Sequence, residues 1–355
     1  MTARSIVFQG YAPVHAVCFL PVYERLRADD EVEVWFTGGY KRGHRPNRTY
    51  VDGVEMFGRL GIPPDRVLDV ETASQRTFDV LVSAATHPIV PFEQCGTTVQ
   101  IFHGISMRNR GVRPENLAYD HLWIVGPFMR QLFARLNLLA PDDPRVVPIG
   151  FPKTDRLIDG TLDRAATLQR LGITGDRPVV LYAPTGAEGN SMEIHGRDLA
   201  TAISRSDQAE LVVKYHDHPR NVGVGPTAAE LETLGNVHVV DDVDVVPLLH
   251  AADVLITDAS SVANEFVLLD RPILFMDVPE VFEITEQKGA YVDFDSRSTG
   301  VIVTSPWDVV EALNDVLAHA DAGGVERRRR ATELYYNPGH ATDAAVDWFR
   351  RELLA

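Results

Sequence analysis

The sequence predicts an α/β protein built from two Rossmann-like, doubly wound halves with mainly parallel sheets. Short apolar runs typical of strands recur along all 355 residues, and helical patterns separate many of them. The runs are almost continuously apolar, as strands are when helices cover both faces of a parallel sheet. A chain of this length also favours about two domains.

The strand-like runs form two series, one in each half of the chain. The first comprises residues 6–8, 32–36, 80–83, 99–102, 122–125 and 146–149; the second comprises 179–182, 211–214, 237–240, 254–256 and 273–275. Helical patterns lie between them, for example at 17–27 and 129–138. Gly150, Phe151 and Pro152 punctuate the chain where the first series ends, so the boundary between the halves is expected there.

These signals divide the chain into three parts. Residues 1–152 form an N-terminal Rossmann-like domain, and residues 153–339 form a C-terminal Rossmann-like domain. Residues 340–355 form a last helix that crosses back to the first domain. Ligands of open α/β sheets bind at the carboxyl ends of the strands, so we expect the two sheets to face each other across a cleft.

Composition excludes several classes of protein. A hydrophobic fraction of 45% and a charged fraction of 24% are typical of a globular protein, and the net charge of −16 argues against a nucleic-acid surface. No apolar run approaches a membrane span, and the N-terminus lacks a signal-peptide pattern, so a cytoplasmic location with at most peripheral membrane contact is expected. The basic clusters at 41–48 and 327–330 fit solvated faces or contacts with anionic lipid.

The segment 253–275, DVLITDASSVANEFVLLDRPILF, is the most informative part of the chain. Its pattern predicts a strand, a tight turn, a helix and a second strand. The hydroxyls of Ser260 and Ser261 would lie beside the free N–H groups at the start of that helix, which suits a phosphate. Glu265 follows one turn later and could accept from a ribose diol. The alternative is an ordinary N-capped helix, in which Asp258 or a serine is the cap.

His103 follows an apolar run and precedes Gly104. This places an imidazole at the carboxyl edge of the sheet, beside a residue that allows a ligand to approach closely. Histidine is suited to proton transfer near neutral pH. The alternative is a histidine that only bonds a neighbouring carbonyl group.

A second group of donors leaves another strand in LVVKYHDHPR, namely Lys214, His216, His218 and Arg220. So many donors at one strand end suit an anionic ligand. The His-x-His spacing is also compatible with a metal, but no third ligand can be identified. Neither of the two cysteines has a CxxC partner, so no zinc site, disulfide or other cofactor is predicted.

The segment YAPTGAEGNS contains Thr185 and two glycines directly after a strand. Such a loop can hold a phosphate, although it lacks the spacing of a P-loop, and the chain contains no GxGxxG fingerprint.

In order along the chain, several of these segments resemble the CDP-glycerol glycerophosphotransferase family, which includes the teichoic-acid primases and polymerases. FHGISMR resembles the family's WHGTxxK, GFPKTDRL its GYPRxDxL, and YAPT the start of its YAPTWR. VVKYH resembles its basic-x-His strand end, and LITDASSVANEFVLLDRPILF resembles its LITDYSSV element. The resemblance runs from about residue 99 to residue 275. It departs from the family at Gly186-Ala187, which stand in place of Trp-Arg.

The resemblance implies a GT-B fold and a metal-independent transferase of surface-polymer synthesis. Such an enzyme moves glycerol phosphate or a related polyol phosphate from a CDP-linked donor to an acceptor hydroxyl and releases CMP. The acceptor would be a hydroxyl-bearing molecule, including a lipid-linked polymer. By residue, the family's general base falls on His103 and its second functional histidine on His216. The phosphate-binding serines fall on Ser260 and Ser261. Further candidates in the matching segments are Thr185, Lys214, His218, Gly104, Arg108, Lys153 and Asp258.

Two other functions fit the same patterns. A GT-B glycosyltransferase or a UDP-sugar 2-epimerase relative would use a similar turn and an acid at the ribose, with chemistry at a sugar carbon. A nucleotide-binding module would keep the fold without turnover. Release of CMP indicates the phosphotransferase, release of UDP or an epimerised sugar indicates the nucleotide-sugar enzyme, and a binding module would release neither.

Overall fold

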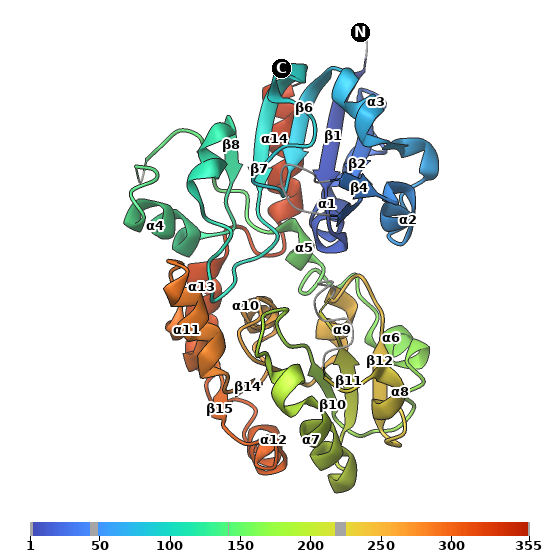
Figure 1. Cartoon of the computed structure of the whole chain (residues 1–355), viewed down its shortest axis with the longest axis vertical. Helices are drawn as coiled ribbons and strands as arrows, with labels where there is room; N and C mark the ends of the chain where they lie inside the picture. The colour runs from blue at the N-terminus through green and yellow to red at the C-terminus, as the bar shows by residue number, and fades with distance from the viewer. Residues whose placement is uncertain (1–2, 43–48, 141, 217–224, 354–355) are drawn as a thin grey trace. The chain divides into compact units, whose positions relative to one another are not determined.

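The computed structural model describes residues 3–42, 49–140, 142–216 and 225–353, and these fold into two compact units (Figure 1). Unit 1 consists of residues 1–104, 111–155 and 334–355. Unit 2 consists of residues 105–110 and 156–333. The short segment 105–110 follows His103 and Gly104 directly in sequence, but its contacts assign it to unit 2.

Unit 1 contains a seven-stranded parallel sheet in the order β5-β2-β1-β6-β7-β8-β9. Its strands are β1 (Arg4–Gly10), β2 (Val32–Gly38), β5 (Val67–Leu68), β6 (Phe78–Ser83), β7 (Cys95–Ile101), β8 (His121–Trp123) and β9 (Val146–Val147). A separate antiparallel pair consists of β3 (Tyr40–Arg42) and β4 (Thr49–Val51).

Helices cover both faces of the unit 1 sheet. They are α1 (Pro13–Leu26), α2 (Gly53–Gly58), α3 (Val70–Gln75), α4 (Pro127–Arg135), α5 (Pro152–Asp155) and α14 (Ala341–Leu353). Phe8 packs on Phe19 of α1, with ring centroids 5.0 Å apart, whereas its neighbour Val7 lies in a cluster with Ala73 of α3. Because successive side chains of a strand point to opposite faces, α1 and α3 lie on opposite sides of β1.

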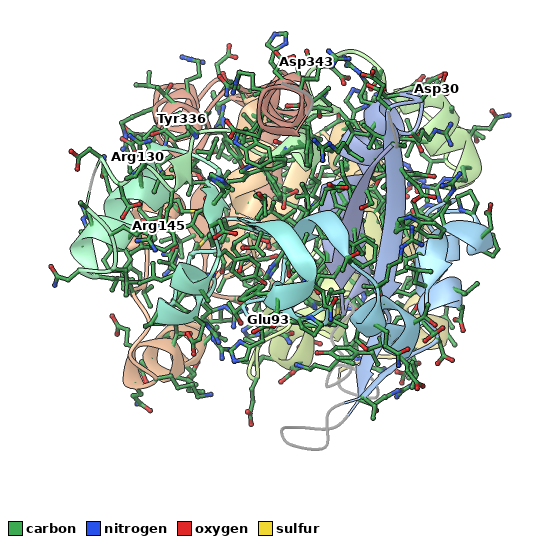
Figure 2. The ribbon with its side chains drawn as sticks, turned by 90° about the horizontal axis from the view of Figure 1, so that it is seen from above. Asp30, Glu93, Arg130, Arg145, Tyr336 and Asp343 are labelled. Carbon is green, nitrogen blue, oxygen red and sulfur yellow. The ribbon has the colours of Figure 1, made fainter. Side chains whose placement is uncertain are left out.

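The last helix, α14, packs against α1 and α5. Asp155 accepts hydrogen bonds from the backbone N–H groups of Ala341 (3.1 Å) and Thr342 (2.6 Å), so its carboxylate caps the start of this helix. In the view of Figure 2, Asp343 marks α14, and the Arg130 guanidinium lies beside Tyr336, 5.9 Å from the ring centroid. The carboxylate of Asp155 therefore has a structural role.

Unit 2 contains a six-stranded parallel sheet in the order β12-β11-β10-β13-β14-β15. The strands are β10 (Val179–Tyr182), β11 (Glu210–Lys214), β12 (Val237–Val240), β13 (Val254–Thr257), β14 (Ile273–Met276) and β15 (Val301–Val303). The helices are α6 (Arg164–Arg170), α7 (Ser191–Ser206), α8 (Ala228–Leu231), α9 (Val246–Ala251), α10 (Val262–Phe266), α11 (Pro279–Gln287), α12 (Val309–Ala318) and α13 (Gly324–Leu334).

The unit 2 sheet is also covered on both faces. Val180 and Tyr182 of β10 share a buried cluster with Leu199 of α7 and Leu313 of α12. Leu181, between them on β10, points to the opposite face, and α9 packs against this strand. Near-continuous apolar strands result, as the sequence predicted.

All eleven predicted strand runs lie in or overlap strands of the two sheets. Four strands lie outside the prediction, namely β3, β4, β5 and β15. All four are two or three residues long and lie at sheet edges or in the separate antiparallel pair, and β5 pairs with β2 through only two residues. β3, β4 and β5 contain at most two consecutive apolar residues, too few to be recognised as an apolar run.

The arginine cluster at 327–330 differs from its prediction as a solvated or lipid-facing surface. Arg327 and Arg330 are each only 2% exposed. The Arg327 guanidinium donates to Asp270 (2.9 Å), and that of Arg330 donates to Asp293 and to Ser296 Oγ (2.9 Å). The prediction is therefore wrong for these two residues, whose charges are compensated by the partly exposed Asp270 and the buried Asp293.

Among the residues that the structure describes, no helix is long and apolar enough to cross a membrane. The same residues contain no group of three His, Cys, Asp or Glu side chains that could hold a metal ion. Cys18 and Cys95 are free thiols.

Candidate active site

The candidate donor-binding residues of unit 2 follow three neighbouring strands. β11, β10 and β13 are adjacent in the sheet and parallel, so their carboxyl ends meet at one edge. Thr185 follows β10, His216 follows β11, and Ser260 and Ser261 follow β13. This edge is where open α/β sheets bind their ligands.

Asp258 connects the loops at this edge. Its carboxylate accepts from the backbone N–H of Thr185 (2.7 Å), from the N–H (2.9 Å) and hydroxyl (2.8 Å) of Ser191, and from the N–H of Ala259 (2.6 Å). Burial raises the pKa of Asp258, and these hydrogen bonds oppose the rise. All four partners are donors, as an ionised carboxylate requires. Asp258 therefore connects the loops that follow β10 and β13, and it is not the N-cap of α10.

Ser260 and Ser261 lie in the turn between β13 and α10. Ser261 is the N-cap residue of α10, yet no side chain caps this helix. Neither serine hydroxyl makes a hydrogen bond to another residue within the described parts of the chain. Ser261 therefore occupies the N-cap position of α10 without making the side-chain hydrogen bond of an ordinary N-cap.

Arg108 reaches the same edge from the segment 105–110. Its guanidinium donates to Thr185 Oγ1 at 2.8 Å. The segment is held in unit 2 because Asn264 of α10 donates to the Ile105 carbonyl (2.8 Å) and Asp293 N–H donates to the Met107 carbonyl (2.7 Å). A cation from a loop distant in sequence thus joins the serine turn through Thr185.

A small pocket lies next to Thr185 and is lined also by Asn190, Glu193, Tyr215 and His216. His216 is exposed, and its ring lies against Gly186, where an added Cβ would come within 2.7 Å of the ring nitrogen Nδ1. The glycine that replaces the family's tryptophan therefore leaves room for this imidazole.

The remaining candidate residues of unit 2 are either buried or outside the described residues. Lys214 is buried, and its ammonium donates to the Tyr215 carbonyl at 3.2 Å. Glu265 is 1% exposed, within α10 and one turn after Ser261. His218 and Arg220 lie outside the described residues.

In unit 1, His103 lies just beyond the carboxyl end of β7. Gly104 has a φ of +143°, a conformation that favours glycine. The His103 side chain keeps a solvent-exposed surface, yet the protein around it desolvates the ring. This desolvation, with the charges of Lys153 and Arg113, lowers the pKa of His103 to about 4. Its imidazole is therefore neutral at pH 7 and able to accept a proton.

Unit 1 brings two further residues to His103 that the sequence reasoning missed. One is Arg113, and the other is His15 in the first turn of α1, whose ring centroid is 5.0 Å from that of His103. His15 follows a strand that ends in Gly10, much as His103 follows its strand. The pattern of a strand followed by glycine and histidine is thus also present here, but four residues separate Gly10 from His15, so the two do not form the adjacent pair seen at His103 and Gly104.

Lys153 is buried in α5, and its ammonium lies 5.8 Å from the Phe151 ring centroid. Its charge acts on His103, so these two predicted residues belong to one neighbourhood.

Two Rossmann-like units with separate parallel sheets define a GT-B-like architecture, and solved structures confirm this fold class. The wall teichoic acid polymerase TagF aligns with a TM-score of 0.69 and 19% identity, covering 98% of this chain and 88% of that chain. A UDP-GlcNAc 2-epimerase from Neisseria meningitidis aligns with a TM-score of 0.63 and 14% identity, covering 99% of this chain and 100% of the other.

The family model described as CDP-Glycerol:Poly(glycerophosphate) glycerophosphotransferase matches residues 72–347, and the chain belongs to this family. The family resemblance predicted from the sequence is thus confirmed. A teichoic acid poly(glycerol phosphate) polymerase of Bacillus subtilis is 28% identical over 56% of this chain and 27% of its own length. A teichoic acid glycerol-phosphate transferase of Staphylococcus aureus is 24% identical over 83% of this chain and 79% of its own length. The chain matches less than half the length of the first two curated relatives.

Proposed function

We propose that the protein transfers glycerol phosphate, or a related polyol phosphate, from a CDP-linked donor to an acceptor hydroxyl and releases CMP. Family membership supports the reaction class. The observation that carries the proposal is the serine turn of unit 2, where two hydroxyls without partners among the described residues lie at the start of α10.

The donor diphosphate is proposed to bind at this turn. Ser260 and Ser261 would donate to its oxygens, together with free N–H groups of the first turn of α10. Arg108, held at Thr185, and His216, at the adjacent pocket, would add positive charge or further donors. Lys214 and His218 remain proposed phosphate ligands, and Glu265 remains the proposed ribose ligand.

His103 is proposed as the general base. The acceptor oxygen forms a bond to the β-phosphorus while its proton passes to the imidazole of His103. The bond from that phosphorus to the bridging oxygen breaks, and CMP leaves with the electron pair. A neutral imidazole suits the first event, and the donors at the serine turn stabilise the charge that gathers on CMP.

The acceptor is proposed to be a hydroxyl on a surface polymer of the teichoic-acid type, including a lipid-linked chain. The names of the curated relatives support this class. We propose a cytoplasmic reaction with at most peripheral contact at the inner face of the membrane. Unit 1 would then serve the acceptor and unit 2 the donor.

Incubation of the protein with CDP-glycerol and a glycerol phosphate oligomer tests the function. We expect CMP, measured by ion-exchange chromatography, together with an acceptor longer by one unit. Parallel reactions with UDP-sugars serve as the control. Release of UDP or an epimerised sugar, without CMP from CDP-glycerol, would contradict the proposal and favour a nucleotide-sugar enzyme.

Replacing His216 with alanine is expected to impair both binding and turnover. Its ring faces the pocket beside Thr185, so loss of a charge-assisted hydrogen bond to the donor should lower kcat/KM roughly 10- to 100-fold. The measurement is CMP release at varied donor concentration. The His319→Ala variant is the control, because that histidine is exposed on the same unit. A His216 variant with native kinetics would remove the residue from the donor site.

A further inference from the structure

A second histidine lies beside the proposed general base in unit 1. The ring centroids of His15 and His103 are 5.0 Å apart, and the two planes are inclined by 43°. Tyr11 and His15 also form a T-shaped pair, with ring centroids 4.5 Å apart and planes inclined by 75°. The three rings thus form a contiguous aromatic cluster beyond the carboxyl ends of β1 and β7. Aromatic pairs at such distances favour defined mutual orientations.

A hydrogen bond fixes the state of the His15 ring. The backbone N–H of Tyr11 donates to His15 Nδ1 at 3.3 Å. His15 is the third residue of α1, and it reaches back to the chain before the helix much as the glutamate of a capping box does. Because Nδ1 accepts, the neutral ring carries its proton on Nε2.

Packing holds His15 in place. The side chain is 2% exposed, and a Cβ added to Gly10 would come within 2.9 Å of the His15 Cβ. Only a residue without a side chain at the end of β1 allows α1 to approach this closely. The ring of His15 is therefore a fixed surface against which a neighbour can rest.

The charges around the pair keep both rings neutral. Burial lowers the pKa of His15 well below its usual value, and His103 and Lys41 lower it further. Lys41 lies over the Tyr11 ring, with its ammonium 4.9 Å from the centroid. His103 is in turn faced by Lys153 and Arg113. Protonation of either histidine would place a further positive charge near Lys41, Lys153 and Arg113.

His103 itself makes no hydrogen bond to another residue in the described parts of the chain. A catalytic base is generally oriented by a further group that restricts its ring. His15 supplies the aromatic contact that the structure records for His103.

We propose that His15 is a positioning residue for the transfer reaction, whose buried ring holds the His103 imidazole in the orientation that accepts the proton of the acceptor hydroxyl. This inference rests on the proposed function for the identity of the reaction. It assigns His15 no contact with the substrate.

Two substitutions separate the positioning role from a structural one. His15→Asn keeps an oxygen near the place of Nδ1, so it preserves the acceptor for Tyr11 N–H but removes the ring. His15→Phe keeps a ring against His103 but removes the acceptor. His340→Asn, at an exposed position of unit 1, is the matched control.

We expect His15→Asn to lower kcat about tenfold or more, with donor KM within twofold and a Tm within a few degrees of the native protein. His15→Phe should keep more of kcat despite a lower Tm. The reverse order, with native kcat in His15→Asn, would overturn the inference.

The titration of His103 gives a readout that does not depend on turnover. Side-chain ¹H–¹⁵N NMR of the native protein should show His103 neutral down to a pH near 4. In His15→Asn, loss of the neighbouring ring lets more water surround the His103 imidazole, so the pKa of His103 should rise toward 6.5, and the acid limb of kcat/KM should rise with it. An unchanged His103 titration overturns the inference whether or not CDP-glycerol is a substrate. Absence of CMP release from the native protein, with a shifted titration, overturns the proposed function alone.

Discussion

Replacing His103 with alanine is expected to reduce the rate of CMP release by roughly a hundredfold or more, the usual loss when a general base is removed. Donor affinity should stay nearly native, because the proposed donor ligands Ser260, Ser261 and Arg108 all belong to unit 2. Steady-state kinetics would give kcat, and calorimetric titration with CDP-glycerol would give the dissociation constant. Native turnover in the variant would exclude His103 from the mechanism.

The pH dependence adds a signed test of the same residue. Since the pKa of His103 is lowered to about 4, the base is already neutral at pH 7 and loses its function only when the pH falls through that value. We expect kcat/KM to remain level from neutral pH to about pH 5. An acid limb near pH 6.5 would show that His103 titrates as an ordinary histidine.

Replacing Asp258 with alanine is expected to lower the free energy of unfolding more than any of the other substitutions. The change would leave the buried N–H groups of Thr185, Ser191 and Ala259 without their acceptor, at a cost of about 3 kcal/mol or more in the free energy of unfolding. Donor KM should rise more than tenfold, because Thr185 and the serine turn lose their common anchor. Urea denaturation and donor kinetics measure the two effects.

Asp258→Asn provides a graded comparison. Its amide oxygen can still accept from Thr185 and Ala259, but its NH₂ group would oppose the N–H of Ser191, so an intermediate loss is expected. Asp242→Ala is the matched control, because its ion pair with Arg170 lies at the surface of the same unit and should contribute less than about 1 kcal/mol. Equal stability of the Asp258 and Asp242 alanine variants would contradict the anchoring role.

The fold could be predicted from the sequence because most of its strands are long enough for their apolar composition to be recognised. Strands such as β10 and β13 are buried on both faces, and their composition therefore reports their environment directly. The serine turn was predictable for a related reason, since strand, turn and helix are adjacent in sequence.

Contacts between distant segments were not accessible to the same reasoning. Nothing in the sequence near Asp258 shows that it binds Thr185 and Ser191, which lie 73 and 67 residues away. The prediction of a solvated face fails similarly at Arg327 and Arg330, because the burial of Arg330 depends on Asp293, in a segment 37 residues earlier. His15 and His103 meet only because β1 and β7 both flank β6 in the sheet. Local patterns report the immediate surroundings of a residue, whereas these roles depend on chain topology.

The assignment of 105–110 to unit 2 constrains how specificity can be exchanged within the family. Unit 2 is assembled from two stretches of chain and unit 1 from three, so no single cut separates them. A chimera that grafts a relative's residues 156–333 alone would keep the old loop and mismatch Arg108 with a foreign Thr185 counterpart. We therefore expect a functional domain exchange to need residues 105–110 together with residues 156–333.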